Sequence, residues 1–489
     1  MNLKNFAAAL GLCAGIFLNL ASLGCGSSLS APVTSVVETP NPLVAEYRLQ
    51  SLREGNTAWV EFGLDTSYGR QTSAVTNSAT TFSILVAGMT PQTTYHMRAR
   101  TDTWVDEDQT FTTGALPAQL PPPSITVTRP TPSLSPAPGV ELFSLVARGA
   151  PKLQSLATDL QGNVIWYYPL GSTPIKPMDN GHFILSIIED LREIDLAGNT
   201  IRDVSVDQVN QSLQMKGYPF SITEFHHDVL VLPNGHWIGL AQSTKPFTDL
   251  PGYPGTTNVL GDVLVDIDLS GNVVWAWSAF DYLDVNRHLM AFPDWTHSNA
   301  LVYTPDGNLL LSVRHQSWIL KIDYENGAGS GNVLWRLGQE GDFTLLGGDP
   351  SDWFYAQHNP NLVTVNGSQM NLAVFDNGDL RLDSGNVACS TTCYSRATVY
   401  QVDENTHIVS LLWFDLPGFY SLWGGSIGTL SNGNVEFDIT TTTGGPMSQI
   451  MEVTQTDNPQ TVWQLNITGE NAYRGFRIPS LYPGVTWTQ

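Results

Sequence analysis

Two turn patterns alternate along the chain from about residue 140 to its end, and they limit its fold more than any other feature. The first is a Gly-Asn pair ahead of an apolar run with a tryptophan, with close copies at Gly162–Trp166, Gly271–Trp275 and Gly331–Trp335. The second is an Asn-Gly or Asp-Gly pair between two apolar runs, at Asn180, Asn234, Asp306, Asn366 and Asn432. Such pairs favour tight β-hairpins. Their alternation predicts a repeating all-β fold with the tryptophans in its core.

Each pair of hairpins is expected to form one four-stranded unit, and the count reaches six. Looser copies of the first pattern occur at Gly198, at Asn405 ahead of Trp413, and at Asn458 ahead of Trp463. The run Val140–Val146 is expected to open the first unit. Residues 140–489 are therefore predicted to form a six-bladed β-propeller with roughly 58 residues per blade, which is long for this fold. The excess is expected in inserted loops at 242–260 and 337–354.

A smaller domain is predicted ahead of the propeller, over residues 30–115. Trp59–Gly63 alternates as a strand, and the run Leu85–Arg100 resembles the end of a fibronectin type III domain, in which a corner tyrosine, here Tyr95, ties a loop to the next strand. We expect a fibronectin-III-like β-sandwich that serves as a spacer or a dimerisation module, so a homo-oligomer is compatible with the sequence. Residues 116–139 are rich in proline and are predicted to be an extended linker.

The first residues have the pattern of a targeting segment. Lys4 is followed by an apolar run, Phe6–Leu23, and residues 1–24 are predicted to be an export signal. The end of the run resembles a lipoprotein-type cleavage site with Cys25 as the lipidated residue. Simple cleavage is the alternative, and a retained spanning helix fits so short a run less well. We expect a periplasmic protein, or a lipoprotein anchored to a membrane and facing the periplasm or exterior.

Apart from this segment and Cys25, the chain has one cysteine pair, Cys389 and Cys393. In an exported chain such a pair predicts a disulfide. Closing so short a loop gains only about 2 kcal/mol in loop entropy, so the bond would mainly make a local segment rigid. A Cys-x-x-x-Cys metal site is the alternative, but no matching His or Cys pair lies nearby, and we expect no metal.

The charge balance excludes one class of partner. There are 22 Lys plus Arg against 45 Asp plus Glu, a formal net charge of −23. Nucleic acid is not expected to bind, because phosphate backbones require a basic face. A glycine-rich phosphate loop with Lys and Ser/Thr is missing from the sequence, so neither a nucleotide donor nor another cofactor is implied.

Three histidines precede the Asn-Gly or Asp-Gly turns at similar distances. His227 lies seven residues before Asn234, His297 nine before Asp306, and His358 eight before Asn366. In a propeller these positions fall at the same end of three inner strands, so the imidazoles are expected to meet at one mouth of the channel. With Arg314 they would make a cationic pocket in an anionic protein, which suits a small anion such as a sulfate ester.

Several motifs in this region together resemble one family. In chain order they are His226-His227-Asp228, Asp294-Trp295-Thr296-His297-Ser298-Asn299, Val313-Arg314-His315-Gln316, Gln357-His358-Asn359-Pro360, Phe375-Asp376-Asn377-Gly378 and Ala472-Tyr473-Arg474-Gly475-Phe476-Arg477. This set is similar to the bacterial aryl-sulfate sulfotransferases. The resemblance implies a six-bladed propeller with an N-terminal β-sandwich. It also implies transfer of a sulfuryl group from an aryl sulfate to a phenol.

The resemblance also implies roles for single residues. His358 would be the nucleophile that becomes transiently sulfated. His297 and Asn299 would contact the sulfuryl group, together with Arg314. The first motif would supply a further histidine, and we favour His227 over His226 because it adjoins Asp228. A hydroxyl from a late blade is expected too, with Thr429 preferred and Ser426 as the alternative.

The chemistry of these groups agrees with this reading. A neutral imidazole is a competent nucleophile near neutral pH. A covalent N-sulfo intermediate splits the reaction into two easier steps, which gives a ping-pong mechanism. Arginine, asparagine and imidazole donors can stabilise charge on the sulfuryl oxygens.

Other functions remain open at this stage. Water in place of the phenol would make the protein an aryl-sulfate hydrolase. A non-catalytic propeller that binds a ligand or a protein is the alternative from a different class. Three histidines could also bind zinc, but an arginine beside them would repel a metal ion.

Overall fold

Strands dominate the computed structural model, which describes residues 32–50, 55–77, 81–146, 152–171, 173–442 and 447–488. Within these ranges only two short α-helices occur, α1 (Val206–Met215) and α2 (Ala279–Tyr282). The all-β prediction is therefore confirmed. The predicted export signal and Cys25 lie outside the described residues. None of the helices in the described ranges is long and apolar enough to span a membrane.

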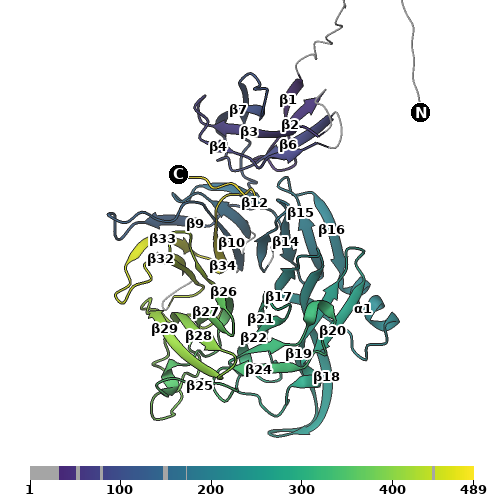
Figure 1. Cartoon of the computed structure of the whole chain (residues 1–489), viewed down its shortest axis with the longest axis vertical. Helices are drawn as coiled ribbons and strands as arrows, with labels where there is room; N and C mark the ends of the chain where they lie inside the picture. The colour runs from purple at the N-terminus through teal and green to yellow at the C-terminus, as the bar shows by residue number, and fades with distance from the viewer. Residues whose placement is uncertain are drawn as a thin grey trace, which may run out of the picture.

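The N-terminal part contains two antiparallel sheets (Figure 1). One has the order β1-β2-β6, with bounds Val33–Glu38, Ala45–Gln50 and Thr81–Val86. The other has the order β4-β3-β7-β8, with β5 also on β3, and bounds Arg70–Gln71, Thr57–Gly63, Thr94–Thr101, Gln109–Thr112 and Val75–Thr76. Buried and exposed residues alternate along β7, as expected of strands with one face in a core. Tyr95 Oη accepts a hydrogen bond from the Thr90 N–H (3.1 Å), which ties the preceding loop to β7.

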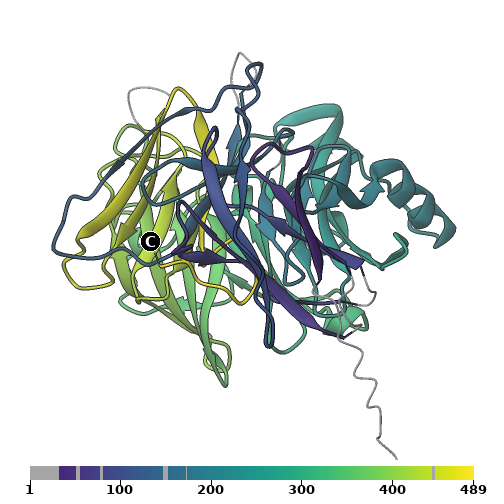
Figure 2. The ribbon, with the colours of Figure 1, turned by 90° about the horizontal axis from the view of Figure 1, so that it is seen from above.

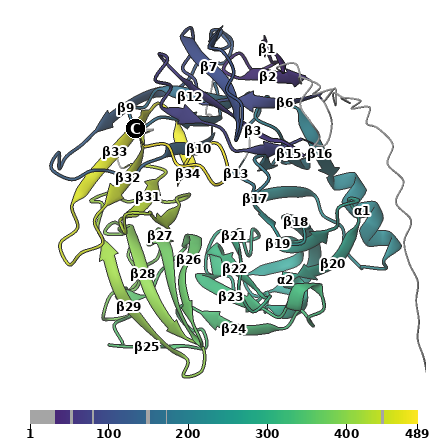
Figure 3. The ribbon, with the colours of Figure 1, turned by 45° about the horizontal axis from the view of Figure 1, so that its top comes forward.

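Six antiparallel sheets follow and are arranged around a common centre (Figure 3). The first is β12-β11-β10-β34, with bounds Val164–Tyr168, Ser155–Thr158, Val140–Val146 and Asn471–Ile478. The second is β13 to β16, with bounds Ile175–Pro177, Phe183–Ser186, Asp190–Ile194 and Thr200–Ser205. The third is β17 to β20, with bounds Glu224–Val231, Trp237–Leu250, Tyr253–Ile267 and Val273–Ser278.

The remaining three sheets complete the circle. The fourth is β21 to β24, with bounds Ser298–Tyr303, Leu309–Val313, Trp318–Ile322 and Val333–Leu337. The fifth is β26 to β29, with bounds His358–Asn366, Gln369–Asp376, Arg396–Asp403 and Ile408–Asp415, and β25 (Thr344–Leu345) lies parallel to β29. The sixth is β30 to β33 followed by β9, with bounds Ile427–Thr429, Val435–Ile439, Met447–Val453, Thr461–Thr468 and Ser124–Thr128.

The two turn patterns fall where the hairpins require them. The five Asn-Gly or Asp-Gly pairs of the repeat each join the first strand of a sheet to its second, as Asn234 does between β17 and β18. The three Gly-Asn pairs that precede a tryptophan, and their looser copies at Gly198, Asn405 and Asn458, join the third strand of a sheet to the fourth, as Gly271 does between β19 and β20. The tryptophans that follow are at least nine-tenths buried, at Trp166, Trp275, Trp335, Trp413 and Trp463.

Strands from both ends of this region close the circle. The last strand, β34, pairs with β10 and becomes the innermost strand of the first sheet. The segment 116–139, predicted as a linker, contains β9, which pairs with β33 at the outer edge of the sixth sheet. The segment 242–260, expected as an inserted loop, instead extends β18 and β19 into one long hairpin. This extension is energetically simple, because each added pair of residues satisfies its own backbone hydrogen bonds.

The C-terminal segment links the N-terminal sheets to the circle of sheets (Figures 1 and 2). The Tyr482 hydroxyl accepts a hydrogen bond from the Ala87 N–H (2.6 Å) and donates one to the Leu85 carbonyl (2.9 Å). Trp487 is 2% exposed and packs edge-on against Phe62, with 5.9 Å between ring centroids. The N-terminal sheets and the first sheets of the circle therefore share one hydrophobic core.

Candidate active site

Three inner strands carry the same local distortion at the same end. Strand pairing is interrupted between Phe225 and Val229, between Ser298 and Ala300, and between His358 and Asn361. One residue beside each break has a left-handed backbone: His227 (φ 58°), His297 (φ 47°) and Asn359 (φ 45°). This conformation is uncommon outside glycine and costs about 1–3 kcal/mol. A bulge re-aims the side chains next to it, and here it directs neighbouring residues toward the common centre.

The distortions bring the three predicted histidines together. The ring centroids of His227 and His297 are 4.8 Å apart. Tyr473, on β34, bridges the group, since its ring centroid lies 5.6 Å from that of His227 and 6.1 Å from that of His358. Residues from the first, third, fourth and fifth sheets thus meet at one place.

His358 is held in one tautomer. The side-chain amide of Asn377 donates to the carbonyls of Ser421 (2.8 Å) and Gly424 (3.0 Å), so its oxygen must face His358 Nδ1 at 2.7 Å. The proton is therefore on Nδ1. Nε2 keeps its lone pair and accepts a weak hydrogen bond from the Gly424 N–H (3.2 Å).

The surroundings also keep His358 uncharged. Burial lowers the pKa of this imidazole well below its usual range, and the charge of Arg314 lowers it further. The hydrogen bond from Nδ1 to Asn377 raises the pKa, but by less than burial and Arg314 lower it. A neutral imidazole with a free Nε2 lone pair is the nucleophilic form.

Arg314 lies at the start of a short 3-10 turn, Arg314–Gln316, that follows β22. Its guanidinium donates to Asp379 Oδ2 (2.8 Å), to the Leu422 carbonyl (2.9 Å) and to His315 Nε2 (2.7 Å). Burial raises the pKa of Asp379 to about 6, although Arg314 acts to lower it. The guanidinium is thus fixed in position, and its charge is only partly balanced.

A possible metal-binding geometry occurs next to this arginine, in Asp294, His297 and His315. His315 Nδ1 donates to the Asp294 carbonyl (2.6 Å), while its Nε2 accepts from Arg314. Burial, together with the charges of His297 and Arg314, lowers the pKa of His315 to about 4. Both ring nitrogens are therefore in use, and this set of residues does not favour a metal ion.

The predicted pairing of His227 with Asp228 is wrong. Asp228 faces the other way, where it forms an ion pair with Lys176 and lies 3.5 Å from Arg474 Nη1. Strand alternation explains this, because Asp228 follows the bulge and returns to the opposite face. The nearest polar partner of His227 is His226, with 2.6 Å between their Nδ1 atoms. His227 is nevertheless the histidine that faces His297 and Tyr473.

The two predicted hydroxyl candidates do not lie in this cluster. Thr429 is exposed and sits at the far end of β30, beside the Asn432 turn. Ser426 Oγ donates to the Gly475 carbonyl (2.8 Å) and accepts from the Gly475 N–H (3.1 Å), which gives it a structural role. Asn299 is fully buried, with its amide donating to the Gln357 carbonyl (2.7 Å) and its Oδ1 without a hydrogen-bond partner.

Tyr473 supplies the hydroxyl that the sequence did not identify. Its ring is buried between His227 and His358, and within the described part of the chain no group completes a well-aligned hydrogen bond to Oη. Burial raises the pKa of this phenol to about 12, so it stays protonated and can donate. The motif Ala472–Arg477 was the available signal, but nothing in the sequence distinguished this tyrosine from a core residue.

The predicted disulfide between Cys389 and Cys393 is present, with 5.3 Å between Cα atoms, in the loop between β27 and β28. The same loop is fixed to the fifth sheet by Asp376, which binds both Arg381 (2.7 Å) and Arg396 (3.0 Å). Asp376 therefore shapes the loop that carries Asn377 and Asp379, and does not itself reach the imidazoles.

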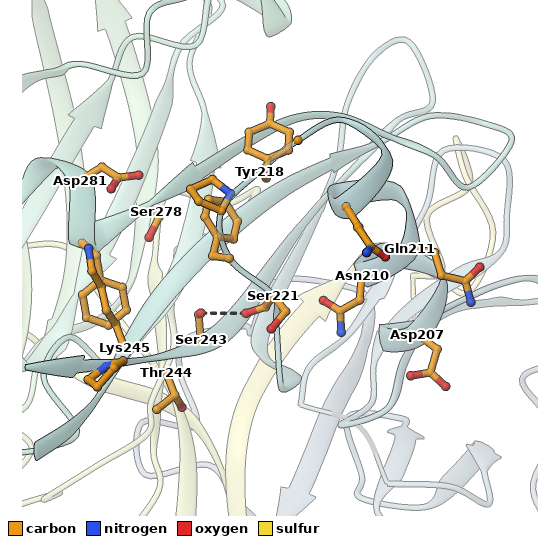
Figure 4. A pocket seen from close by; sticks show the side chains of 16 residues that line it. Asp207, Asn210, Gln211, Tyr218, Ser221, Ser243, Thr244, Lys245, Ser278 and Asp281 are labelled. Atoms are coloured by element: carbon orange, nitrogen blue, oxygen red, sulfur yellow. Dashed lines mark hydrogen bonds between the residues drawn. The ribbon is translucent and has the colours of Figure 1, made fainter. Parts of the chain in front are cut away.

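A large cavity of about 890 Å³ lies elsewhere, between α1 and β18 (Figure 4). Asn210 and Gln211 of α1 face it from one side and Lys245 of β18 from another, and Ser243 donates to the Ser221 carbonyl (2.7 Å) at its wall. Its lining, in the described part of the chain, contains neither a histidine nor an arginine. The group at the common centre is therefore the stronger catalytic candidate.

An all-β chain whose inner strands gather neutral imidazoles, a protonated tyrosine and a fixed guanidinium has the make-up of an enzyme for small anionic substrates. This chain belongs to the arylsulfotransferase (ASST) family, whose model matches residues 139–476. The match spans all the site residues described above. It supports a sulfotransferase-type enzyme with an aryl sulfate and a phenol as its small-molecule substrates.

Solved structures resemble this chain only distantly. One is a protein of unknown function from Bacteroides caccae, with 11% identity, a TM-score of 0.41 and coverage of 69% of this chain and 98% of that one. Another is a putative 6-phosphogluconolactonase from Bacteroides fragilis NCTC 9343, with 11% identity, a TM-score of 0.37 and coverage of 70% and 98%. Among curated proteins no match was found.

Proposed function

We propose that this protein moves a sulfuryl group from an aryl sulfate to a phenol through a sulfohistidine on His358, in a ping-pong sequence that needs no nucleotide donor. The observation that carries the proposal is the state of His358, which is neutral, buried and locked by Asn377 with Nε2 as the unprotonated nitrogen. We further propose that the six sheets form a six-bladed propeller and that the N-terminal sheets form a fibronectin-III-like sandwich. The arrangement around one centre supports the first part.

In the first half-reaction, the Nε2 lone pair of His358 attacks sulfur and the bond from sulfur to the phenolic oxygen breaks. In the second, the oxygen of an acceptor phenol attacks the same sulfur and the bond to Nε2 breaks. Sulfuryl transfer of this kind has a loose transition state, so alignment and charge stabilisation contribute most of the acceleration.

Asn377 has a specific part in keeping the intermediate reactive. Its oxygen accepts the Nδ1 proton of His358 but, unlike a carboxylate, cannot remove it. The sulfated ring therefore stays an imidazolium, and the group that leaves sulfur in the second half-reaction is a neutral imidazole. A carboxylate at this position could take the Nδ1 proton, and an imidazolate, a poorer leaving group, would then have to depart.

The donors for the sulfuryl oxygens come from three different sheets. Arg314 supplies a fixed positive charge, and Tyr473 supplies a protonated hydroxyl that has no well-aligned hydrogen bond among the described residues. The Gly424 N–H, which points at Nε2 before the reaction, lies beside the new bond once sulfur is attached. An added Cβ at Gly424 (φ +69°) would lie 2.2 Å from Thr440 Oγ1, so glycine is required for this close approach.

The disulfide supports a further proposal, that the chain is exported. Disulfides persist in oxidising compartments and are rare in reducing ones. Lipidation at Cys25 and a periplasmic location extend the same proposal.

The test is release of a coloured phenol from an aryl sulfate, measured with and without a second phenol as acceptor. Release that depends on the acceptor, with formation of the sulfated acceptor, supports transfer. Equal release in water alone would indicate an aryl-sulfate hydrolase, and no release with any aryl sulfate would indicate a binding protein. His358→Ala should abolish release in each case, since no other described group replaces its Nε2.

A further inference from the structure

Adjacent residues in a regular strand point to opposite faces, yet His226 and His227 face each other. The bulge in β17 and the left-handed backbone of His227 turn the two rings until their Nδ1 atoms are 2.6 Å apart. At this distance one proton lies between the two nitrogens, because two protons would clash and none would leave two lone pairs in contact.

The other end of His226 meets a carboxylate. His226 Nε2 lies 3.1 Å from Asp262 Oδ1, a close charge contact that is not aligned as a good hydrogen bond. Asp262 is itself fixed, because its Oδ2 accepts from the Ser298 N–H (2.6 Å). The order in space is therefore Asp262, His226, His227, and then the common centre with His297 and Tyr473.

The surroundings shift the pKa values of the two imidazoles in opposite directions. Burial lowers the pKa of His226, but the charges of Asp262 and Glu224 outweigh burial, so the pKa is raised overall. His227 is faced by His226, His297, His358 and Arg474, and its pKa falls well below its usual range, first through burial and then through these cations and imidazoles. His226 therefore holds the positive charge, while His227 is neutral with its proton on Nε2.

We propose that Asp262, His226 and His227 form a proton relay in which His226 stores the proton that the leaving phenol needs. This inference rests on the proposed function and extends it. Here His227 acts on the substrate, and His226 acts through His227.

The number of protons on the relay is restored over the two half-reactions. As sulfur moves to His358, His227 gives its Nε2 proton to the phenolate oxygen and takes the Nδ1 proton of His226, which becomes neutral. When the acceptor phenol attacks, its proton passes to His227 Nε2, and the Nδ1 proton returns to His226. Neither step leaves His227 as an anion or as a second cation beside Arg474.

The relay has a consequence for substrate range. An acidic phenol leaves as a phenolate with little help, whereas a weakly acidic phenol must be protonated as it departs. The stored proton should therefore matter most for aryl sulfates of weakly acidic phenols. The sulfate donors of this protein are therefore expected to include aryl sulfates of weakly acidic phenols.

His226→Gln is the direct test, since a glutamine amide can donate to His227 Nδ1 but cannot deliver a proton. The measurement is kcat/KM for aryl sulfates whose leaving phenols range from strongly to weakly acidic. In a ping-pong scheme this quantity reports only the first half-reaction. We expect a loss of a few-fold for the most acidic phenol, growing to about 10²-fold for the least acidic. An equal loss along the whole series would overturn the relay.

Asp262→Asn provides a second variant with the same expected trend, and the unchanged protein provides a test that needs no variant. With the least acidic leaving phenol, kcat/KM measured in mixtures of H2O and D2O should curve with the deuterium fraction, because two protons move together. A straight line would overturn the relay, as only one proton would then be in motion. Failure of the proposed function would look different, since no donor would then sulfate His358.

Discussion

At the scale of single residues, one amide decides which nitrogen of His358 carries the proton. Asn377 is held by two carbonyls, and its remaining oxygen fixes the imidazole proton on Nδ1. The same contact leaves the charge of the ring to its surroundings, of which burial and Arg314 are the strongest. Asn377 is therefore the point at which a small change should alter the chemistry without removing the nucleophile.

Asn377→Asp should raise the pKa of His358, because a carboxylate at 2.7 Å stabilises the imidazolium. In the unchanged protein the lowered pKa keeps His358 neutral down to pH values well below 6.5. The variant should lose activity at higher pH than the unchanged protein does, so the acid limb of its kcat/KM profile moves up. An acid limb that stays in place would contradict the assigned tautomer.

Tyr473→Phe removes one hydroxyl and keeps the ring. Since none of the described groups is well aligned with Oη, the unfolding free energy should change by less than about 1 kcal/mol. Loss of a donor to the sulfuryl oxygens should lower kcat by about 10- to 10³-fold. Thr429→Val is the matched control, because that hydroxyl is exposed and lies away from the cluster. Equal turnover by both variants would show that the Tyr473 hydroxyl takes no part in the reaction.

Spacing alone predicted His227, His297 and His358 as a group, because similar distances from equivalent turns place residues at similar heights in repeated strands. It could not predict their partners. Asp228 adjoins His227 in sequence but faces Lys176, and Tyr473 arrives from a strand more than 200 residues away. Contacts of this kind depend on bulges and on pairing between distant strands, and neither can be predicted from a short motif.

At the scale of elements, Arg477 of β34 joins the sheets on either side of the closure. Its guanidinium donates to Glu141 of β10 (2.9 Å) and to Glu452 of β32 (3.2 Å), and lies 3.1 Å from Glu436 of β31. One cation thus faces three buried carboxyl groups. Burial raises the pKa of Glu141 and of Glu436, and the charge of Glu436 adds to the shift at Glu141.

This cluster should make stability depend on pH. Because the folded pKa values of Glu141 and Glu436 lie above the unfolded value of about 4.3, the folded protein binds more protons than the unfolded chain above that pH. The unfolding free energy should therefore fall as pH rises from about 4.3 through the folded values, by up to about 1.4 kcal/mol per pH unit for each proton.

Glu436→Gln should weaken this dependence, as one titrating group is removed while an acceptor for the Arg477 N–H remains. Denaturant unfolding at a series of pH values would measure the slope for both proteins. Parallel slopes would show that these carboxyl groups are not the source. Leu362→Val on β26, outside the cluster, serves as a control that should shift the curve without changing its slope.

Local elements were well predicted and long-range ones were not. The hairpins follow from dipeptides such as Asn366-Gly367, which fix a turn within a few residues. The strand β9 sits in a proline-rich segment that indicates a linker, and its partner β33 lies more than 300 residues away. No local pattern records that pairing.

At the scale of the whole molecule, the C-terminal segment packs against the N-terminal sheets and joins them to the circle of sheets. The Trp487 indole donates to the Gln71 carbonyl (3.0 Å), and the guanidinium of Arg70 lies 5.0 Å from its ring centroid. Gly88 (φ +97°) lets the ring approach, since an added Cβ would lie 2.3 Å from it. The N-terminal sheets and the circle of sheets are therefore expected to unfold together.

Trp487→Ala should destabilise the protein by about 3–5 kcal/mol, the usual cost of removing a large buried ring. It should also separate one unfolding transition into two, because the N-terminal sheets lose their contact with Trp487. Calorimetry would detect both effects. Since the described contacts of Trp487 involve no site residue, kcat/KM at low temperature should stay close to that of the unchanged protein. A single transition at an unchanged temperature would contradict this account.

The most direct test of the central claim is mass spectrometry of the protein after brief incubation with an aryl sulfate and no acceptor. We expect one added sulfuryl group on the peptide that contains His358, lost again when a phenol is added, with the sulfated phenol as product. Sulfation of another residue, or phenol release with no labelled protein at any time, would contradict a sulfohistidine at His358.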